Sequence, residues 1–145
     1  MDLYEALVEM YLTVFEGCAV IPQVPILEDV NGKGWEACPD FLAIDFREGR
    51  IQVVEVTKTL DGGAVKELAN RKLEAHYREN VEHYVRTKTL AKQLQLPTHW
   101  RFFVRAGKEG AVRSAQAYVD FPEAKDRVQI TKLEDVFDEI KRVMP

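Results

Sequence analysis

The sequence predicts an α/β protein in which a mixed central β-sheet is flanked by helices. Apolar residues recur at helical spacing near both ends of the chain, and two β-rich segments in the middle are separated by a short turn. A long amphipathic helical segment follows these strands. The length of 145 residues suits one domain, so residues 1–145 are expected to form a single unit.

The first helix is predicted from its start and stop signals. Asp2 and Glu5 have the spacing of a capping box, and Gly17 follows the last apolar residue of the helical pattern. Residues 19–26 then form an extended segment that is broken by two prolines.

The remaining elements follow from the same periodicities and from turn residues. The helical pattern of residues 65–96 is longer than a usual globular helix, which favours a break near residues 86–89. The predicted strands are residues 39–46, 50–57, 99–106, 115–121 and 128–131, and the final helix is predicted over residues 133–143.

The first two of these strands are expected to form a hairpin, and its register decides which side chains meet. With residues 47–50 as the loop, Asp40 lies opposite Thr57, while Asp40 and Glu55 are diagonal neighbours. Side chains alternate along a strand, so both carboxylates point to one face of the sheet, roughly 7–8 Å apart by backbone geometry.

Two carboxylates at this spacing repel each other unless a cation lies between them. Oxygen ligands of this kind suit Mg²⁺ or Mn²⁺, with water and substrate phosphate in the other positions. Glu55 also follows an apolar run, so its carboxylate is expected to be partly buried, which costs free energy without a compensating partner. The hairpin therefore predicts a divalent-metal site.

Pro39-Asp40 at the start of one strand and Glu55 in the next resemble the motif of the PD-(D/E)XK, or restriction-endonuclease-like, nuclease superfamily. The order of elements, with a helix, the hairpin, a long basic helix and further strands, is similar as well. The resemblance implies a metal-dependent phosphodiesterase of that fold. Asp40, Glu55 and the backbone carbonyl of Val56 would hold the metal, which would activate a water molecule.

The resemblance also implies further catalytic residues. Glu9 or Glu5, one turn apart on the first helix, would complete the site. The family motif places a lysine two residues after the acid, where this chain has Thr57. Lys58 could replace it through a β-bulge, or a lysine could reach in from the following helix. The candidates on that helix are Lys66 and Lys72.

Charge is segregated along the chain. The net charge of −4 divides into three segments, with 11 acidic and 3 basic side chains in residues 1–55, 6 acidic and 12 basic in residues 56–119, and 7 acidic and 5 basic in residues 120–145. The basic part fits either a phosphate-binding surface on the long helix, which Arg101 and Arg105 could join, or a helix whose basic side chains are simply solvated. Tyr77 and Tyr84, one heptad apart, fit either core packing or base stacking. The predicted phosphate-binding residues are Lys66, Arg71, Lys72 and Arg78.

Together these features predict a Mg²⁺- or Mn²⁺-dependent nuclease, with DNA preferred over RNA by analogy with the family. The alternative is a catalytically inactive member of the same fold that binds nucleic acid or protein, which the threonine in place of the motif lysine favours. In the nuclease, specificity would come from nucleic-acid structure, from a partner, or from a homodimer or larger complex. No apolar run approaches the length of a membrane span, and the two cysteines favour a reduced, cytoplasmic environment.

Overall fold

The computed structural model describes residues 1–26, 37–57, 75–89, 91–105 and 127–144. The elements in these ranges follow the order expected from the sequence. They are α1 (Leu3–Met10), the π-helical turn η1 (Tyr11–Phe15), β1 (Ala19–Pro22), β2 (Phe41–Asp45), β3 (Arg50–Thr57), α3 (Ala75–Lys88), α4 (Ala91–Leu94), β4 (Thr98–Val104), β5 (Val128–Lys132) and α6 (Leu133–Val143).

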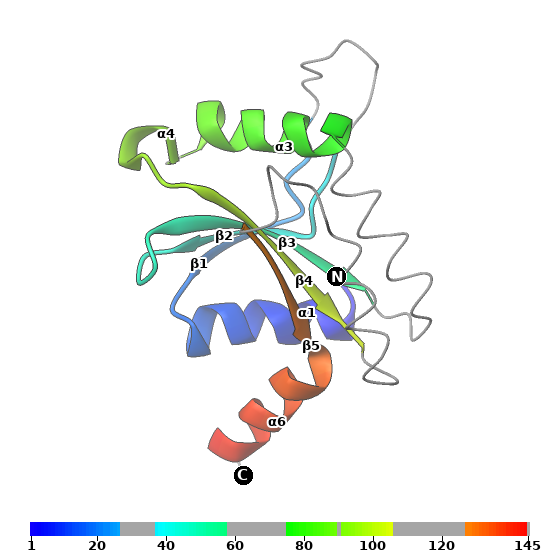
Figure 1. Cartoon of the computed structure of the whole chain (residues 1–145). Helices are drawn as coiled ribbons and strands as arrows, with labels where there is room; N and C mark the ends of the chain where they lie inside the picture. The colour runs from blue at the N-terminus through cyan, green and yellow to red at the C-terminus, as the bar shows by residue number, and fades with distance from the viewer. Residues whose placement is uncertain (27–36, 58–74, 90, 106–126, 145) are drawn as a thin grey trace.

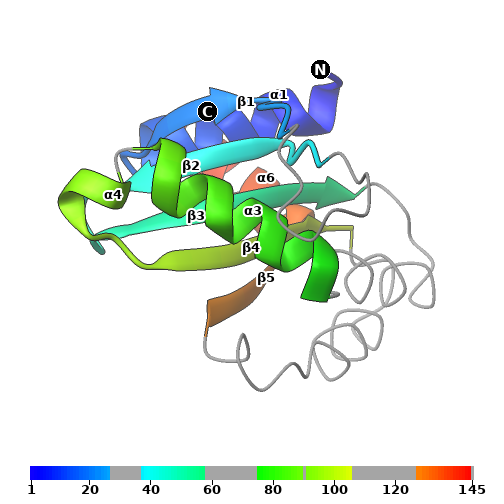
Figure 2. The same ribbon diagram turned by 90° about the horizontal axis from the view of Figure 1, so that it is seen from above.

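Five strands form one mixed sheet in the order β1-β2-β3-β4-β5. The first three strands are antiparallel neighbours, whereas β4 runs parallel to β3 and β5 runs parallel to β4. In Figure 1, α3 lies on one side of the sheet, and α1 and α6 lie on the other; Figure 2 shows α3 crossing above the strands. The predicted mixed sheet flanked by helices is therefore confirmed.

Alternation along the strands divides the core into two clusters, one on each face of the sheet. On the face toward α3, Ile51, Val53 and Trp100 pack with Val81 and Val85 of the helix. The second cluster lies toward α1 and α6, and its members are Val8, Leu12, Cys18, Phe41, Ala43, Val54, Phe103, Leu133 and Val136. Both faces are apolar because each is covered by helix, which explains why β2 is buried along its whole length.

The β2–β3 hairpin is present, but its predicted register is wrong by two residues. Ile44 pairs with Ile51 and Phe41 with Val54. The reason is the turn, which closes one residue earlier on each side. The Asp45 carboxylate accepts hydrogen bonds from the backbone N–H groups of Arg47 and Glu48, both at 3.1 Å.

Gly49 completes this turn. Its φ of +66° lies in the left-handed region, which a residue without a Cβ adopts without strain. Asp45 then pairs with Arg50 as the last pair of the hairpin, and their side chains form an ion pair of 3.4 Å. Because the shift is an even number of residues, every side chain keeps the face that the sequence predicted.

Other expectations are confirmed or lie outside the described residues. The long helical segment does break where expected, because α3 ends at Lys88 and α4 follows. The strand expected over residues 115–121 and the start of the long helix, residues 65–74, lie outside the described ranges. Across those ranges, every helix is too short or too polar to traverse a lipid bilayer.

Replacing Gly49 tests the turn that sets the register. Gly49→Ala should lower the free energy of unfolding by about 1 kcal/mol, because a Cβ in the left-handed region is strained. Apart from its two neighbours in the chain, no described residue has an atom within 4 Å of the position that this Cβ would occupy, so the expected cost comes from backbone conformation. Gly49→Asn, which tolerates this conformation better, should cost less. Urea unfolding of both variants measures the difference, and equal losses would contradict this account of the turn.

Candidate metal and nuclease site

Asp40 and Glu55 meet where β2 begins and β3 approaches its end. Phe41 pairs with Val54, so Asp40, one residue before β2, lies level with Glu55. The Asp40 Oδ2 atom accepts a hydrogen bond of 2.7 Å from the backbone N–H of Val56. The two carboxyls are therefore directly opposed rather than diagonal, and closer than the predicted register placed them.

Glu55 is buried, with 5% of its surface exposed, on the face toward α3. Tyr77 of α3 donates a hydrogen bond of 2.9 Å from its hydroxyl to Glu55 Oε1. Burial, the charge of Glu55 and the hydrogen bond to it raise the pKa of Tyr77 far above its ordinary value, so the phenol remains a donor. This bond fixes one oxygen of the Glu55 carboxyl.

Glu5 brings a third carboxyl from the first turn of α1. It completes the predicted capping box, with Glu5 N–H donating to Asp2 Oδ1 at 2.9 Å and Asp2 N–H donating to Glu5 Oε2 at 2.8 Å. The side chain of Glu5 also forms a hydrogen bond with that of Asp40. Glu9 lies one turn further along α1 and is half-buried, and within the described part of the chain it is Glu5, Glu55 and the backbone of Val56 that interact with the Asp40 carboxyl.

Burial is the main cause that raises the pKa of Asp40 above its usual value. The Val56 N–H opposes this shift, because it stabilises the ionised form. The charge of Glu5 and the hydrogen bond to it raise the pKa further, while a hydrogen bond with Glu55 lowers it. Asp40 thus has a carboxyl from each of two other elements, α1 and β3, beside its own.

The Asp40 carboxyl contacts those of Glu5 and Glu55 directly. Among the residues that the structure describes, no group of three or more His, Cys, Asp or Glu side chains is arranged so that it could hold a metal ion. Mg²⁺, however, is usually bound through one or two carboxylates, with water in the remaining positions. The pair of Asp40 and Glu55 fits that requirement, because two carboxylates this close are mutually repulsive unless a proton or a cation lies between them.

The basic residues predicted for the site are only partly described. Thr57, where the resemblance leads us to expect a lysine, is the last residue of β3. The predicted catalytic Lys58 and the predicted phosphate-binding residues Lys66, Arg71 and Lys72 lie outside the described residues.

Two arginines predicted for the phosphate-binding surface are instead buried in the structure. Arg78 is 7% exposed and forms an ion pair of 3.7 Å with Glu82, one turn along α3. Arg101 is 4% exposed on the opposite face of the sheet, where it pairs with Glu16 and donates to Thr131 Oγ1 at 3.1 Å. Both guanidinium groups thus serve interactions within the protein, because a charge buried beside an apolar core needs a carboxylate partner.

Two features of the site were missed in the sequence. The hydrogen bond from Tyr77 to Glu55 had a readable signal, since Tyr77, Val81 and Val85 share one helix face and Glu55 points to the sheet face that such a helix covers. No signal in the sequence showed that Glu5 rather than Glu9 contacts Asp40, because this depends on where α1 crosses the end of the sheet.

No protein-family model matches this chain, and no curated protein matches it. The geometry of the described residues therefore carries the functional argument.

Removing the Tyr77 hydroxyl tests its bond to Glu55. Tyr77→Phe should lower the free energy of unfolding by about 1–3 kcal/mol, because a buried carboxyl loses a donor. Tyr84→Phe is the matched control, since Tyr84 lies on the same helix and its hydroxyl makes no hydrogen bond to a described residue. Urea unfolding of the two variants compares them, and an equal effect would mean that the bond contributes nothing specific.

The raised pKa of Asp40 predicts a pH dependence of stability. Protonated Asp40 is favoured in the folded chain, so its contribution is present below the unfolded pKa and is lost as the pH rises through the folded pKa. Asp40→Asn should therefore lose less thermal stability than the wild type between about pH 4 and pH 8.

The matched control for this comparison is Asp138→Asn, which removes an exposed carboxylate on α6. Its melting temperature should follow the wild-type pH profile. If Asp40→Asn shows the same profile as well, burial does not disfavour the ionised form of Asp40.

Proposed function

We propose that this chain is a Mg²⁺- or Mn²⁺-dependent nuclease that hydrolyses phosphodiester bonds of nucleic acid, with DNA preferred over RNA. The observation that carries the proposal is that the Asp40 and Glu55 carboxyls lie opposite each other at one end of the sheet, with Glu5 beside Asp40. Burying carboxyls side by side costs free energy, which a bound divalent cation would offset. Carboxyls in such an environment are typical of functional sites.

Asp40 and Glu55 would bind the ion, and the backbone of Val56 supports a third ligand. The N–H and C=O groups of one residue in a strand point to the same side, and the Val56 N–H points to Asp40. The Val56 carbonyl is therefore directed past the start of β2, toward the carboxyls. When bound, the ion would lower the pKa of a water molecule and offset charge on the phosphate.

The topology supports a restriction-endonuclease-like fold. A helix precedes an antiparallel three-stranded meander, and a helix then leads to strands that are parallel to the third. The acidic residues lie where the PD-(D/E)XK resemblance requires, with Asp40 at the start of β2 and Glu55 within β3. Glu5 is our preferred third carboxyl, because it contacts Asp40.

A non-catalytic binding module of the same fold is the second candidate. The threonine at position 57 favours it, because the family motif has a lysine there. The direct contacts among the carboxyls favour it as well, since they satisfy one another without a cation.

Cleavage assays separate the two candidates. Purified protein is incubated with supercoiled, linear and branched DNA and with single-stranded RNA, in Mg²⁺, Mn²⁺ or EDTA. We expect metal-dependent cleavage that falls by about 100-fold or more in Asp40→Asn and in Glu55→Gln, because each removes a ligand charge. Salt-sensitive binding without cleavage in any metal would favour the binding module instead.

A second pair of variants identifies the third carboxyl. Glu5→Gln should reduce metal-dependent cleavage by about tenfold, and more than Glu9→Gln does, because its carboxyl contacts Asp40. Calorimetric titration with Mn²⁺ should show the same order of effects on metal affinity. A larger loss in Glu9→Gln would assign the role to Glu9 and contradict the preference for Glu5.

A further inference from the structure

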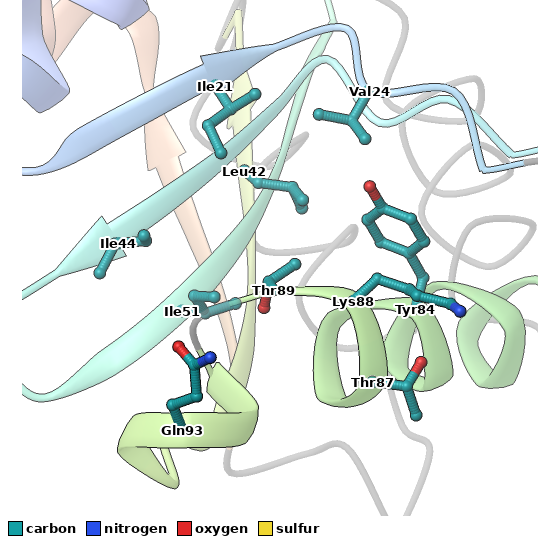
Figure 3. A pocket seen from close by; sticks show the side chains of 10 residues that line it. All are labelled: Ile21, Val24, Leu42, Ile44, Ile51, Tyr84, Thr87, Lys88, Thr89 and Gln93. Atoms are coloured by element: carbon teal, nitrogen blue, oxygen red, sulfur yellow. The ribbon is translucent and has the colours of Figure 1, made fainter.

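A pocket of about 750 Å³ lies between the sheet and the C-terminal part of α3. Leu42, Ile44 and Ile51 form its apolar side on two strands, and Tyr84 and Gln93 lie across from them on α3 and α4. Figure 3 shows the Tyr84 hydroxyl pointing toward Val24, and the Gln93 amide pointing toward Ile51. This volume is in the range of pockets that bind small molecules, and its polar groups are few and placed apart.

The pocket continues the sheet face that carries the candidate site. Leu42 and Ile44 follow Asp40 at alternate positions of β2, and Ile51 precedes Glu55 by four residues on β3. Side chains at alternate positions share a face, and two residues of a strand span about 7 Å. The nearest pocket residue on β2, Leu42, is therefore about 7 Å along the strand from Asp40.

The chemistry of the walls suits a nucleobase with its phosphate. The apolar side and the Tyr84 ring can cover the flat faces of a base, while the Tyr84 hydroxyl and the Gln93 amide can pair with its polar edge. Lys88 also lines the pocket, and none of the described residues that line this pocket is acidic. A purely apolar peptide would leave these polar groups without a partner, so charge and polarity favour the nucleotide.

We propose that this pocket receives one unpaired nucleobase beside the phosphate that is cleaved, which makes single-stranded, gapped or branched nucleic acid the substrate class. The inference rests on the proposed nuclease function, whose site it extends. A base that is stacked in a duplex has both of its faces covered by its neighbours, so it must already be unpaired or be displaced from its stack before it can enter the pocket.

Fluorescence of 2-aminopurine tests the pocket without any cleavage. Oligonucleotides carry this base at an unpaired or at a paired position and are titrated with the full chain in EDTA. We expect the fluorescence to change on binding only where the base is unpaired. Tyr84→Ala should weaken binding of the unpaired probe about tenfold because stacking is lost, and Tyr84→Phe should retain most of it.

A matched pair of larger substitutions tests occupancy. Ile21 lines the pocket and is 45% exposed, so Ile21→Trp narrows the entrance without removing a core side chain. Val14→Trp places the same residue on η1, where Val14 is 67% exposed away from the pocket. Ile21→Trp should abolish the change in fluorescence, whereas Val14→Trp should not.

The outcomes separate this inference from the proposed nuclease function. Metal-dependent cleavage without any change for the unpaired probe overturns the pocket and leaves the nuclease proposal in place. A fluorescence change without cleavage in any metal leaves the pocket in place and overturns the nuclease proposal. A concentration-dependent dimer that Ile21→Trp disrupts and Val14→Trp does not would assign the pocket to a second copy of the chain, and so overturn the inference.

Discussion

The Asp45 carboxylate is the constraint on which the rest of the site depends. It is 3% exposed, it accepts hydrogen bonds from two backbone N–H groups of the turn, and it pairs with Arg50. These contacts end β2 at one fixed residue, and so they decide that Asp40 lies level with Glu55. A slip of one residue would send the two carboxyls to opposite faces of the sheet.

The sequence predicted the faces of the strands better than their pairing. Alternating apolar residues indicate which side chains point inward, and that pattern is unchanged by an even shift of register. The pairing itself was set by turn chemistry, in which Asp45 and Gly49 carry the information. A register predicted from these two turn residues would have placed Asp40 directly opposite Glu55.

Contacts between elements that are distant in sequence were harder to predict. The capping box was visible in the sequence, but its second use, in which Glu5 also contacts Asp40, depends on how α1 packs under the sheet. Likewise, the buried positions of Arg78 and Arg101 follow from the carboxylates that the fold brings to them. Counting charges along the chain cannot distinguish an arginine in an internal ion pair from one that is presented to a phosphate.

The buried carboxyls of the site lower the stability of the folded chain. Proteins often keep buried polar side chains at functional positions, although apolar side chains there would make the fold more stable. Tyr77 limits this cost, because its hydroxyl supplies a hydrogen bond to Glu55 that water would otherwise provide.

One helix joins the two halves of the proposed substrate site. Tyr77, which holds Glu55, and Tyr84, which borders the pocket, are seven residues apart on α3, a rise of about 10 Å. Val81, fully buried between them, anchors that stretch to the sheet. Because both tyrosines are on this one helix, a ligand that shifts α3 at one tyrosine would shift it at the other as well. The proposed metal site and the proposed nucleobase pocket would then be thermodynamically linked, and each ligand would change the affinity of the other by the same factor.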